Sequence, residues 1–233
     1  MKRLSELLQP IEYGASRAAC NLAILTILAF TFTLPARAEI VVAALGDSLT
    51  QGYGLPQGDG FVPQLQNWLI ENGAEDVRLV NAGVSGDTTA GGLARIGWTL
   101  DGTVDAVIVN LGGNDLLRGI EPSNSRANLD AILAEISAQG LQALLVSIPA
   151  PANYGPDYKA EYDAIFPDLS AKYDTLLYTN FLQALGDTDD PASLARVMQG
   201  DFTHPNAQGL ALIVAAIGPT VLQLVEKARA NQD

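Results

Sequence analysis

The sequence predicts an α/β domain built on a parallel β-sheet. Short, uninterrupted apolar runs such as residues 40–45 (Ile-Val-Val-Ala-Ala-Leu) are typical of strands that are buried on both faces. Amphipathic stretches alternate with these runs, which is the order expected when a crossover helix joins each strand to the next. No internal repeat or low-complexity linker interrupts the alternation. We therefore expect a single sheet with right-handed crossovers.

Five apolar runs are predicted to be strands. The first is followed by Gly46, the second by Asn81 and the fourth by Pro149, which are residues that commonly end strands. The fifth run, Thr-Leu-Leu-Tyr, is the weakest of the five. In chain order, the predicted strands are residues 40–45, 77–80, 104–109, 143–148 and 175–178.

Five stretches with helical periodicity separate or follow these strands. In the clearest of them, Leu129, Ile132, Leu133 and Ile136 follow the i, i+3, i+4, i+7 spacing of one helix face. The last stretch contains Gly218-Pro219, which predicts a break in the helix because proline lacks the amide hydrogen. The predicted helices are residues 61–71, 88–100, 122–139, 158–173 and 206–230.

Residues 1–38 are predicted to be a cleavable secretory signal peptide. Basic residues come first, an apolar stretch follows over residues 22–34, and Ala36-Arg37-Ala38 is an A-x-A cleavage pattern. A membrane anchor is the alternative, but the apolar stretch is short against the ~20 residues of a span. A lipoprotein is disfavoured because Cys20 precedes the apolar stretch. We expect a periplasmic or secreted domain of residues 39–233, without a stable membrane anchor after cleavage.

The composition of this domain excludes several partners and cofactors. The only cysteine lies in residues 1–38, together with four of the 13 basic and two of the 26 acidic residues, so the predicted mature chain has a formal charge of −15. Such a chain is repelled by nucleic acid and by anionic membrane surfaces. One histidine and no cysteine do not suffice for a typical zinc site, and the acidic stretch 186–191 lacks the EF-hand pattern. Neither a P-loop nor a G-x-G-x-x-G motif is present, and no cofactor is expected.

Polar and glycine-rich segments follow the predicted strands at their carboxyl ends. Ligands of parallel α/β sheets bind at this edge, so we expect these segments to form the functional site. A further segment, Asp201-Phe202-Thr203-His204, precedes the last helix and is predicted to reach the same edge. The strand-end segments are Gly46-Asp47-Ser48, residues 81–88, Gly112-Gly113-Asn114-Asp115 and residues 149–154.

His204 is the only histidine and therefore the only candidate for a histidine base. Asp201, three residues earlier, is placed to accept the Nδ1–H and leave Nε2 free, although another carboxylate could do so. Ser48 and Ser85 are both candidates for the nucleophile that His204 would activate. Ser85 lies in a near match to G-x-S-x-G, but Asp87 replaces the last glycine, so the nucleophile elbow is absent.

Gly86 and Asn114 are candidate donors to an oxyanion. A backbone N–H near a helix start and a side-chain amide at a strand end are both suited to this task. Each also has a purely structural interpretation. Gly86 could simply belong to a turn whose helix is capped by Asp87, and Asn114 could form an Asx-turn.

Together these motifs resemble the SGNH (GDSL) hydrolases, and especially the branch of periplasmic acyl-CoA thioesterase I, lysophospholipase L1 and arylesterase. The blocks occur in the expected order across nearly the whole mature chain. The resemblance implies a flavodoxin-like three-layer sandwich with a five-stranded parallel sheet. It implies Ser48 as nucleophile, His204 as base and Asp201 as the orienting acid of an esterase or thioesterase that forms an acyl-enzyme. The implied oxyanion donors are the Ser48 and Gly86 N–H groups and the Asn114 side chain.

Substrate contacts are expected from the segments beside this site, for a small-molecule or lipid ester. Residues 115–120 could form a mobile lip over an acyl chain, or their leucines could belong to the core. Two alternatives to an acyl esterase stay open: a carbohydrate O-acetylesterase of the same family, and a non-catalytic binding module. The predicted substrate-binding residues are Asp115, Leu116, Leu117, Pro149, Ala150, Asn153 and Tyr154.

Overall fold

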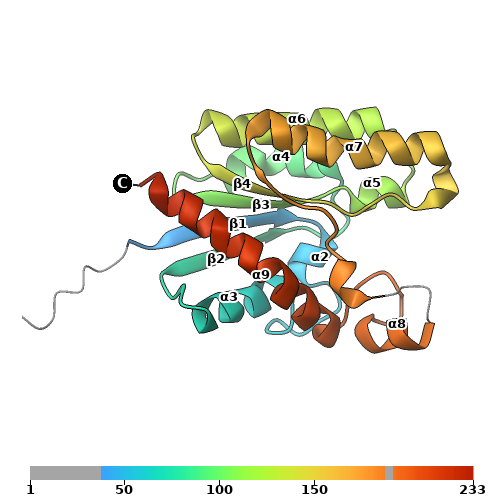
Figure 1. The fold of residues 1–233 in the computed structure, drawn as a ribbon, viewed down its shortest axis with the longest axis horizontal. Helices are drawn as coiled ribbons and strands as arrows, with labels where there is room; N and C mark the ends of the chain where they lie inside the picture. Colours follow the sequence, from blue (N-terminus) through green and yellow to red (C-terminus); the bar gives the residue numbers. More distant parts are fainter. Residues whose placement is uncertain (1–37, 187–190, 233) are drawn as a thin grey trace, which may run out of the picture. The chain divides into compact units, whose positions relative to one another are not determined.

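The five predicted strands form one parallel sheet in the computed structural model, which describes residues 38–186 and 191–232 (Figure 1). The strand order is β2-β1-β3-β4-β5, and every neighbouring pair is parallel. This is the order of flavodoxin-like sheets, which confirms the predicted fold class. The strands are β1 (Ile40–Gly46), β2 (Val77–Gly83), β3 (Ala106–Asn110), β4 (Gln142–Val146) and β5 (Leu176–Tyr178).

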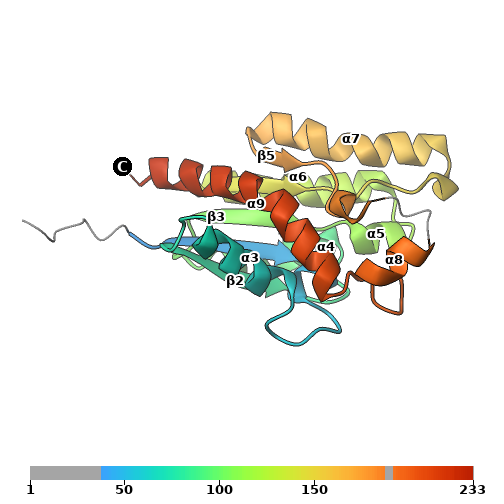
Figure 2. The ribbon, with the colours of Figure 1, turned by 60° about the horizontal axis from the view of Figure 1, so that its bottom comes forward.

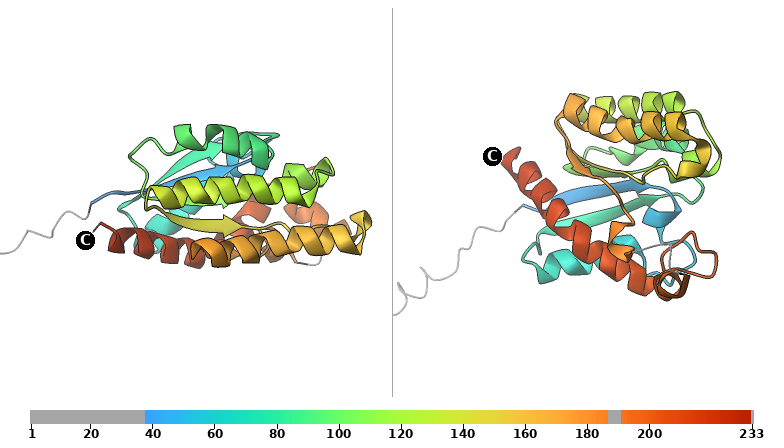
Figure 3. Two further views of the ribbon diagram at one scale, coloured as in Figure 1. Left: turned by 90° about the horizontal axis from the view of Figure 1, so that it is seen from above. Right: turned by 45° about the vertical axis from the view of Figure 1, so that its right-hand side comes forward.

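Helices cover both faces of the sheet and give three layers (Figures 1 and 3). One layer consists of α3 (Phe61–Glu71) and α9 (Ala207–Ala230). The opposite layer consists of α4 (Thr89–Thr99), α6 (Pro122–Ala138) and α7 (Pro156–Tyr173). The shorter elements are α2 (Ser48–Gln51), α5 (Gly113–Leu117), α8 (Pro191–Val197) and the 3₁₀ turns η1 (Ala152–Tyr154) and η2 (Gln183–Leu185).

The apolar run of β1 is continuous because its alternate side chains enter two different cores. Val42 and Ala44 pack toward α3 and α9, whereas Val41 and Ala43 pack toward α4, α6 and α7. Every residue of β1 is buried. A strand covered on both faces has no polar positions, as the sequence pattern predicted.

The predicted break in the last helix is wrong. The helix α9 continues through Pro219, although Figure 2 shows its axis changing direction along its length. Gly218 has a packing role instead, because a Cβ there would lie 2.6 Å from ring atoms of Trp68 on α3. Within the described part of the chain, α9 is the one helix long and apolar enough to span a membrane, yet half of that apolar stretch is buried in the protein. It is a core helix of this fold.

Several boundaries differ from the predicted ones. β2 continues beyond Val80 to Gly83, where it pairs with Gly46 of β1. Residues Gly113–Leu117, expected as a loop, form the short helix α5. The predicted signal peptide, except for Ala38, lies outside the described residues. So does the centre of the acidic stretch 186–191.

Candidate active site

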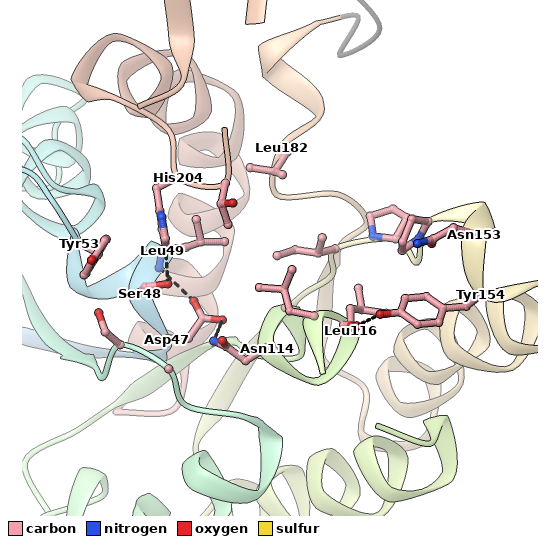
Figure 4. Close-up of a pocket in the computed structure, with 18 residues that line it drawn as sticks. Asp47, Ser48, Leu49, Tyr53, Asn114, Leu116, Asn153, Tyr154, Leu182 and His204 are labelled. Carbon is pink, nitrogen blue, oxygen red and sulfur yellow. Dashed lines mark hydrogen bonds between the residues drawn. The ribbon is translucent and has the colours of Figure 1, made fainter. Parts of the chain in front are cut away.

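Four loops meet at the carboxyl edge of the sheet and surround a pocket of about 450 Å³ (Figure 4). Ser48 follows β1, Gly86 follows β2, Asn114 follows β3, and His204 comes from the loop before α9. All four line the pocket. The structure therefore brings together residues that are up to 156 positions apart in the sequence.

Ser48 is placed by a tight strand-to-helix turn. β1 ends at Gly46, and a Cβ there would lie 2.0 Å from Thr50 Oγ1, so only glycine fits. Asp47 caps the following helix by accepting a 3.0 Å hydrogen bond from the Leu49 N–H. Ser48 is the first residue of this helix, where backbone N–H groups have no partner within the helix. Ser48 lines the pocket from this position.

His204 connects Ser48 to Asp201. Its Nε2 lies 2.9 Å from Ser48 Oγ, and its Nδ1 lies 2.7 Å from Asp201 Oδ2. The other carboxylate oxygen accepts from the backbone N–H groups of Thr203 and His204 at 2.9 and 3.0 Å. The hydrogen bond from the His204 ring is the main cause that lowers the pKa of Asp201 to about 2. Asp201 is thus an anion at any pH near neutrality.

Ser85 is not paired with the histidine. It lines the same pocket, but its hydroxyl donates to the side-chain oxygen of Gln51. The hydrogen bond to the ring of His204 belongs to Ser48. Of the two serines considered from the sequence, only Ser48 is within hydrogen-bond distance of the histidine ring.

Gly86 and Asn114 line the same pocket as Ser48. Gly86 has a φ of +84°, a conformation that favours glycine, and its carbonyl accepts a 2.7 Å hydrogen bond from Arg118. Asn114 is the second residue of α5, and its amide donates to Asp47 Oδ2 at 3.3 Å. An amide has two N–H groups, so one remains for a ligand.

Asp47 is a buried carboxyl directly behind these groups. Its side chain is only 2% exposed, and burial raises its pKa to about 6 despite the hydrogen bonds from Leu49 and Asn114. A raised value is the sign of a carboxylate that lacks a full set of partners in a dry environment. Asp47 therefore places partial or full negative charge beside the site at neutral pH.

The far wall of the pocket is largely apolar and includes five of the seven predicted substrate contacts. Leu49, Ile148 and Leu182 also line the pocket, and so does Tyr53, which the sequence did not single out and which lies on the side of His204. Tyr53 and Leu182 lie in segments without helical or strand periodicity, so no pattern pointed to them. The predicted residues found in the lining are Leu116, Leu117, Pro149, Asn153 and Tyr154.

The prediction for Asp115 and Ala150 is wrong, because neither residue lines the pocket. Asp115 is fully buried and accepts hydrogen bonds from the Thr89 N–H, the Thr89 hydroxyl and Ser125 Oγ at 2.8, 2.6 and 2.9 Å. Ala150 is 2% exposed, and its N–H donates to Asp163. Both positions support the pocket wall from behind.

The segment of residues 115–120, predicted as a lip or as part of the core, contains both buried and exposed leucines. Leu116 is buried and Leu117 is 68% exposed, so the segment contributes to both the core and the pocket mouth. Tyr154 donates to the carbonyl of Leu116 at 2.5 Å, and Tyr158 donates to that of Ile120 at 2.8 Å. The segment is therefore hydrogen-bonded to η1 and α7, the two elements that follow β4.

Among residues 38–186 and 191–232, no group of three or more His, Cys, Asp or Glu side chains is placed to hold a metal ion. A serine, a histidine and an aspartate in hydrogen-bond contact at the carboxyl edge of a parallel sheet form the arrangement of a serine hydrolase.

The chain belongs to the GDSL-like lipase/acylhydrolase family, whose model matches residues 44–212. It is similar to esterase TesA of Pseudomonas aeruginosa, with 34% identity over 199 residues that cover 85% of this chain and 96% of that protein. It is 35% identical over 175 residues to thioesterase 1/protease 1/lysophospholipase L1 of Escherichia coli, which covers 75% and 79% of the two chains. The family predicted from the motifs is thus confirmed, and the chain is a carboxylic ester hydrolase.

A solved structure agrees with this assignment. The crystal structure of AlinE4, an SGNH-hydrolase family esterase, is similar with a TM-score of 0.65 and 41% sequence identity. The match covers 79% of this chain and 96% of AlinE4. The SGNH fold therefore extends over most of the described residues.

Proposed function

We propose that this chain is a serine esterase that cleaves acyl esters or thioesters through Ser48, His204 and Asp201. The observation that carries the proposal is the position of His204 between the other two residues, at 2.9 Å from Ser48 Oγ and 2.7 Å from Asp201 Oδ2. A serine hydroxyl is a weak nucleophile until a base removes its proton, and an orienting acid fixes the tautomer of that base. His204 is the only histidine that could do this.

The mechanism follows from this geometry. Ser48 Oγ attacks the carbonyl carbon while its proton passes to His204 Nε2, and the carbonyl electron pair moves to the oxygen. His204 then gives the proton to the leaving alcohol or thiol, which leaves an acyl group on Ser48. Water attacks this acyl-enzyme and loses a proton to His204, which returns that proton to Ser48 Oγ as the bond to the acyl group breaks and the acid is released. Asp201 keeps the ring in place and balances its positive charge in both halves.

Three donors are proposed to stabilise the oxyanion. They are the N–H groups of Ser48 and Gly86 and the amide of Asn114, which all line the pocket beside the nucleophile. Ser48 contributes through its position at the start of α2, and Gly86 through the positive φ that turns its peptide. Donors arranged in advance act without reorganisation, and this is usually the largest single contribution to such reactions.

The lining of the pocket favours an acyl chain over acetyl as the group bound beside Ser48. Leucine, isoleucine and proline side chains make up much of the pocket lining. Each CH₂ group buried there contributes up to about 0.8 kcal/mol, or about fourfold in kcat/KM. A panel of p-nitrophenyl esters from acetyl to octanoyl is expected to show kcat/KM rising with chain length. A preference for acetyl esters would favour the carbohydrate O-acetylesterase instead.

A fluorophosphonate probe tests the nucleophile. The parent and Ser85→Ala proteins should be labelled stoichiometrically and should hydrolyse p-nitrophenyl butyrate, whereas Ser48→Ala should do neither. Peptide mass mapping should place the label on Ser48. Labelling of Ser85, or parent-level hydrolysis by Ser48→Ala, would contradict the mechanism, and a folded parent that is never labelled would indicate a binding module.

We also propose that the enzyme is exported and released. The support is the basic start, the apolar stretch and the A-x-A pattern ending at Ala38, just before β1 begins at Ile40. The mature enzyme would then act on small-molecule or lipid esters without a membrane anchor, in the periplasm or outside the cell. Mass spectrometry of the protein from a fractionated host should find Glu39 as the first residue in the soluble exported fraction. An intact N-terminus in the membrane fraction would refute export with cleavage.

A further inference from the structure

Tyr53 lies against the imidazole of His204. The two ring centroids are 4.8 Å apart and the ring planes are inclined by 40° (Figure 4). Tyr53 lines the pocket and its residue is 52% exposed, so its ring is not part of the core. The position therefore needs an explanation other than packing of the fold.

The backbone of Tyr53 is tied to the loop that carries His204. Gln199 Nε2 donates to the carbonyls of Tyr53 and Pro205 at 2.8 and 3.1 Å, and the Gln199 N–H donates to the carbonyl of His204 at 2.8 Å. Gly54 allows this approach, because a Cβ there would lie 2.3 Å from Gln199 Oε1. One glutamine thus holds the tyrosine and the histidine in register.

We propose that Tyr53 is a positioning residue whose ring face stabilises the positively charged form of His204. The proposal rests on the proposed function, since the positive charge forms only when His204 takes the proton of Ser48. The face of an aromatic ring is negative, and it attracts a cation whose centre lies within about 6 Å. The centroid distance of 4.8 Å meets this condition. Asp201 then balances the charge in the plane of the ring, and Tyr53 balances it from the face.

This attraction is specific to the transition state. In the resting enzyme the imidazole that accepts the serine proton is neutral, and the ring of Tyr53 gains little from it. Positive charge develops on His204 during both acylation and deacylation. An interaction made only in the transition state changes kcat and kcat/KM together and leaves KM nearly unchanged.

Three variants separate the aromatic face from the hydroxyl and from simple bulk. Tyr53→Phe keeps the ring, Tyr53→Leu keeps an apolar side chain without a ring, and Tyr53→Ala removes both. The assays are kcat and KM with p-nitrophenyl acetate, whose short acyl group makes little use of the apolar wall, and the second-order rate of fluorophosphonate labelling. Thermal unfolding of each variant checks that the fold is unchanged.

The expected result is a kcat for Tyr53→Phe close to that of the parent and a loss of about two- to fivefold in Tyr53→Leu at similar KM. Labelling should slow by the same factor. A kcat of Tyr53→Leu equal to that of the parent would overturn the proposal, because the ring would then contribute nothing. An equal loss in Tyr53→Leu and Tyr53→Phe would also overturn it, because the hydroxyl would then be responsible. Ser48→Ala in the same assays distinguishes a failure of the Tyr53 proposal from a failure of the proposed function. If Ser48→Ala stays active, the proposed function itself has failed.

Discussion

Replacing Asp47 by Asn should change how the stability of this enzyme depends on pH. Asp47 is 2% exposed, and burial raises its pKa to about 6 from an ordinary value of 3.8. The folded protein therefore holds this proton more tightly than the unfolded chain does. As pH rises through this interval, the unfolded chain releases the proton first, and the native state loses stability relative to it. An asparagine in the same place retains an oxygen for the Leu49 N–H and has no charge to bury.

The size of the effect follows from the two pKa values. The difference between pKa values of about 6 and 3.8 corresponds to a loss of about 3 kcal/mol in unfolding free energy. This loss begins at about pH 4 and reaches its full size above pH 6. The usable range starts near pH 5, because the sequence pI is about 4.3 and the protein loses its solubilising charge there. Between pH 5 and pH 8 the parent should lose about 1.4 kcal/mol relative to Asp47→Asn.

Urea unfolding of both proteins at pH 5, 6, 7 and 8 measures this difference, and the titration of groups that do not interact with Asp47 cancels in it. Asp59→Asn, which removes an exposed carboxylate outside the pocket, is the matched control for the loss of one negative charge. A constant difference between the parent and Asp47→Asn over the whole range would refute the reasoning, because it would mean that burial does not alter the affinity of Asp47 for its proton.

Three further substitutions test other parts of the structure. Asn114→Ala should lower kcat for p-nitrophenyl butyrate roughly 10²- to 10³-fold with a smaller change in KM, since it removes one proposed oxyanion donor; an unchanged kcat would exclude it from the oxyanion site. Asp201→Asn should lower kcat on the order of 10⁴-fold, because the amide can hold His204 in the wrong tautomer; near-normal turnover would mean that another acid orients the ring. Gly218→Ala should destabilise the fold by about 1–3 kcal/mol in urea unfolding, because its Cβ would lie 2.6 Å from Trp68; unchanged stability would show that Trp68 moves without cost.

The parts of the site that the sequence predicted are those whose chemistry leaves few choices. A single histidine in the chain restricts the base to His204, and the spacing to Asp201 is short enough to be judged without a fold. The strands were predictable for a similar reason, because burial on both faces removes polar residues from a run such as that of β1. These conclusions depend on composition and local spacing, which a sequence shows directly.

The parts that were missed or misplaced depend on where side chains point. Asp115 follows Asn114 directly and was expected beside it at the pocket, but both lie in α5, where successive residues point about 100° apart. Tyr53 and Gln199 are brought together across 146 positions by loops without periodicity, so no local pattern connects them. Pro219 predicted a break by its own chemistry, and the packing of α9 against the sheet outweighed that preference.

The position of Asp115 also explains how such a short helix can carry functional side chains. A helix of five residues is not stable on its own, because too few hydrogen bonds offset the cost of its first turn. Asp115 fastens α5 to the start of α4 through Thr89 and to α6 through Ser125. The preceding residue, Asn114, then faces Asp47 and the pocket, and Leu116 and Leu117 form the wall beyond it. Asp115, which was expected to contact the substrate, instead holds α5 in place, and α5 carries Asn114, a proposed oxyanion donor.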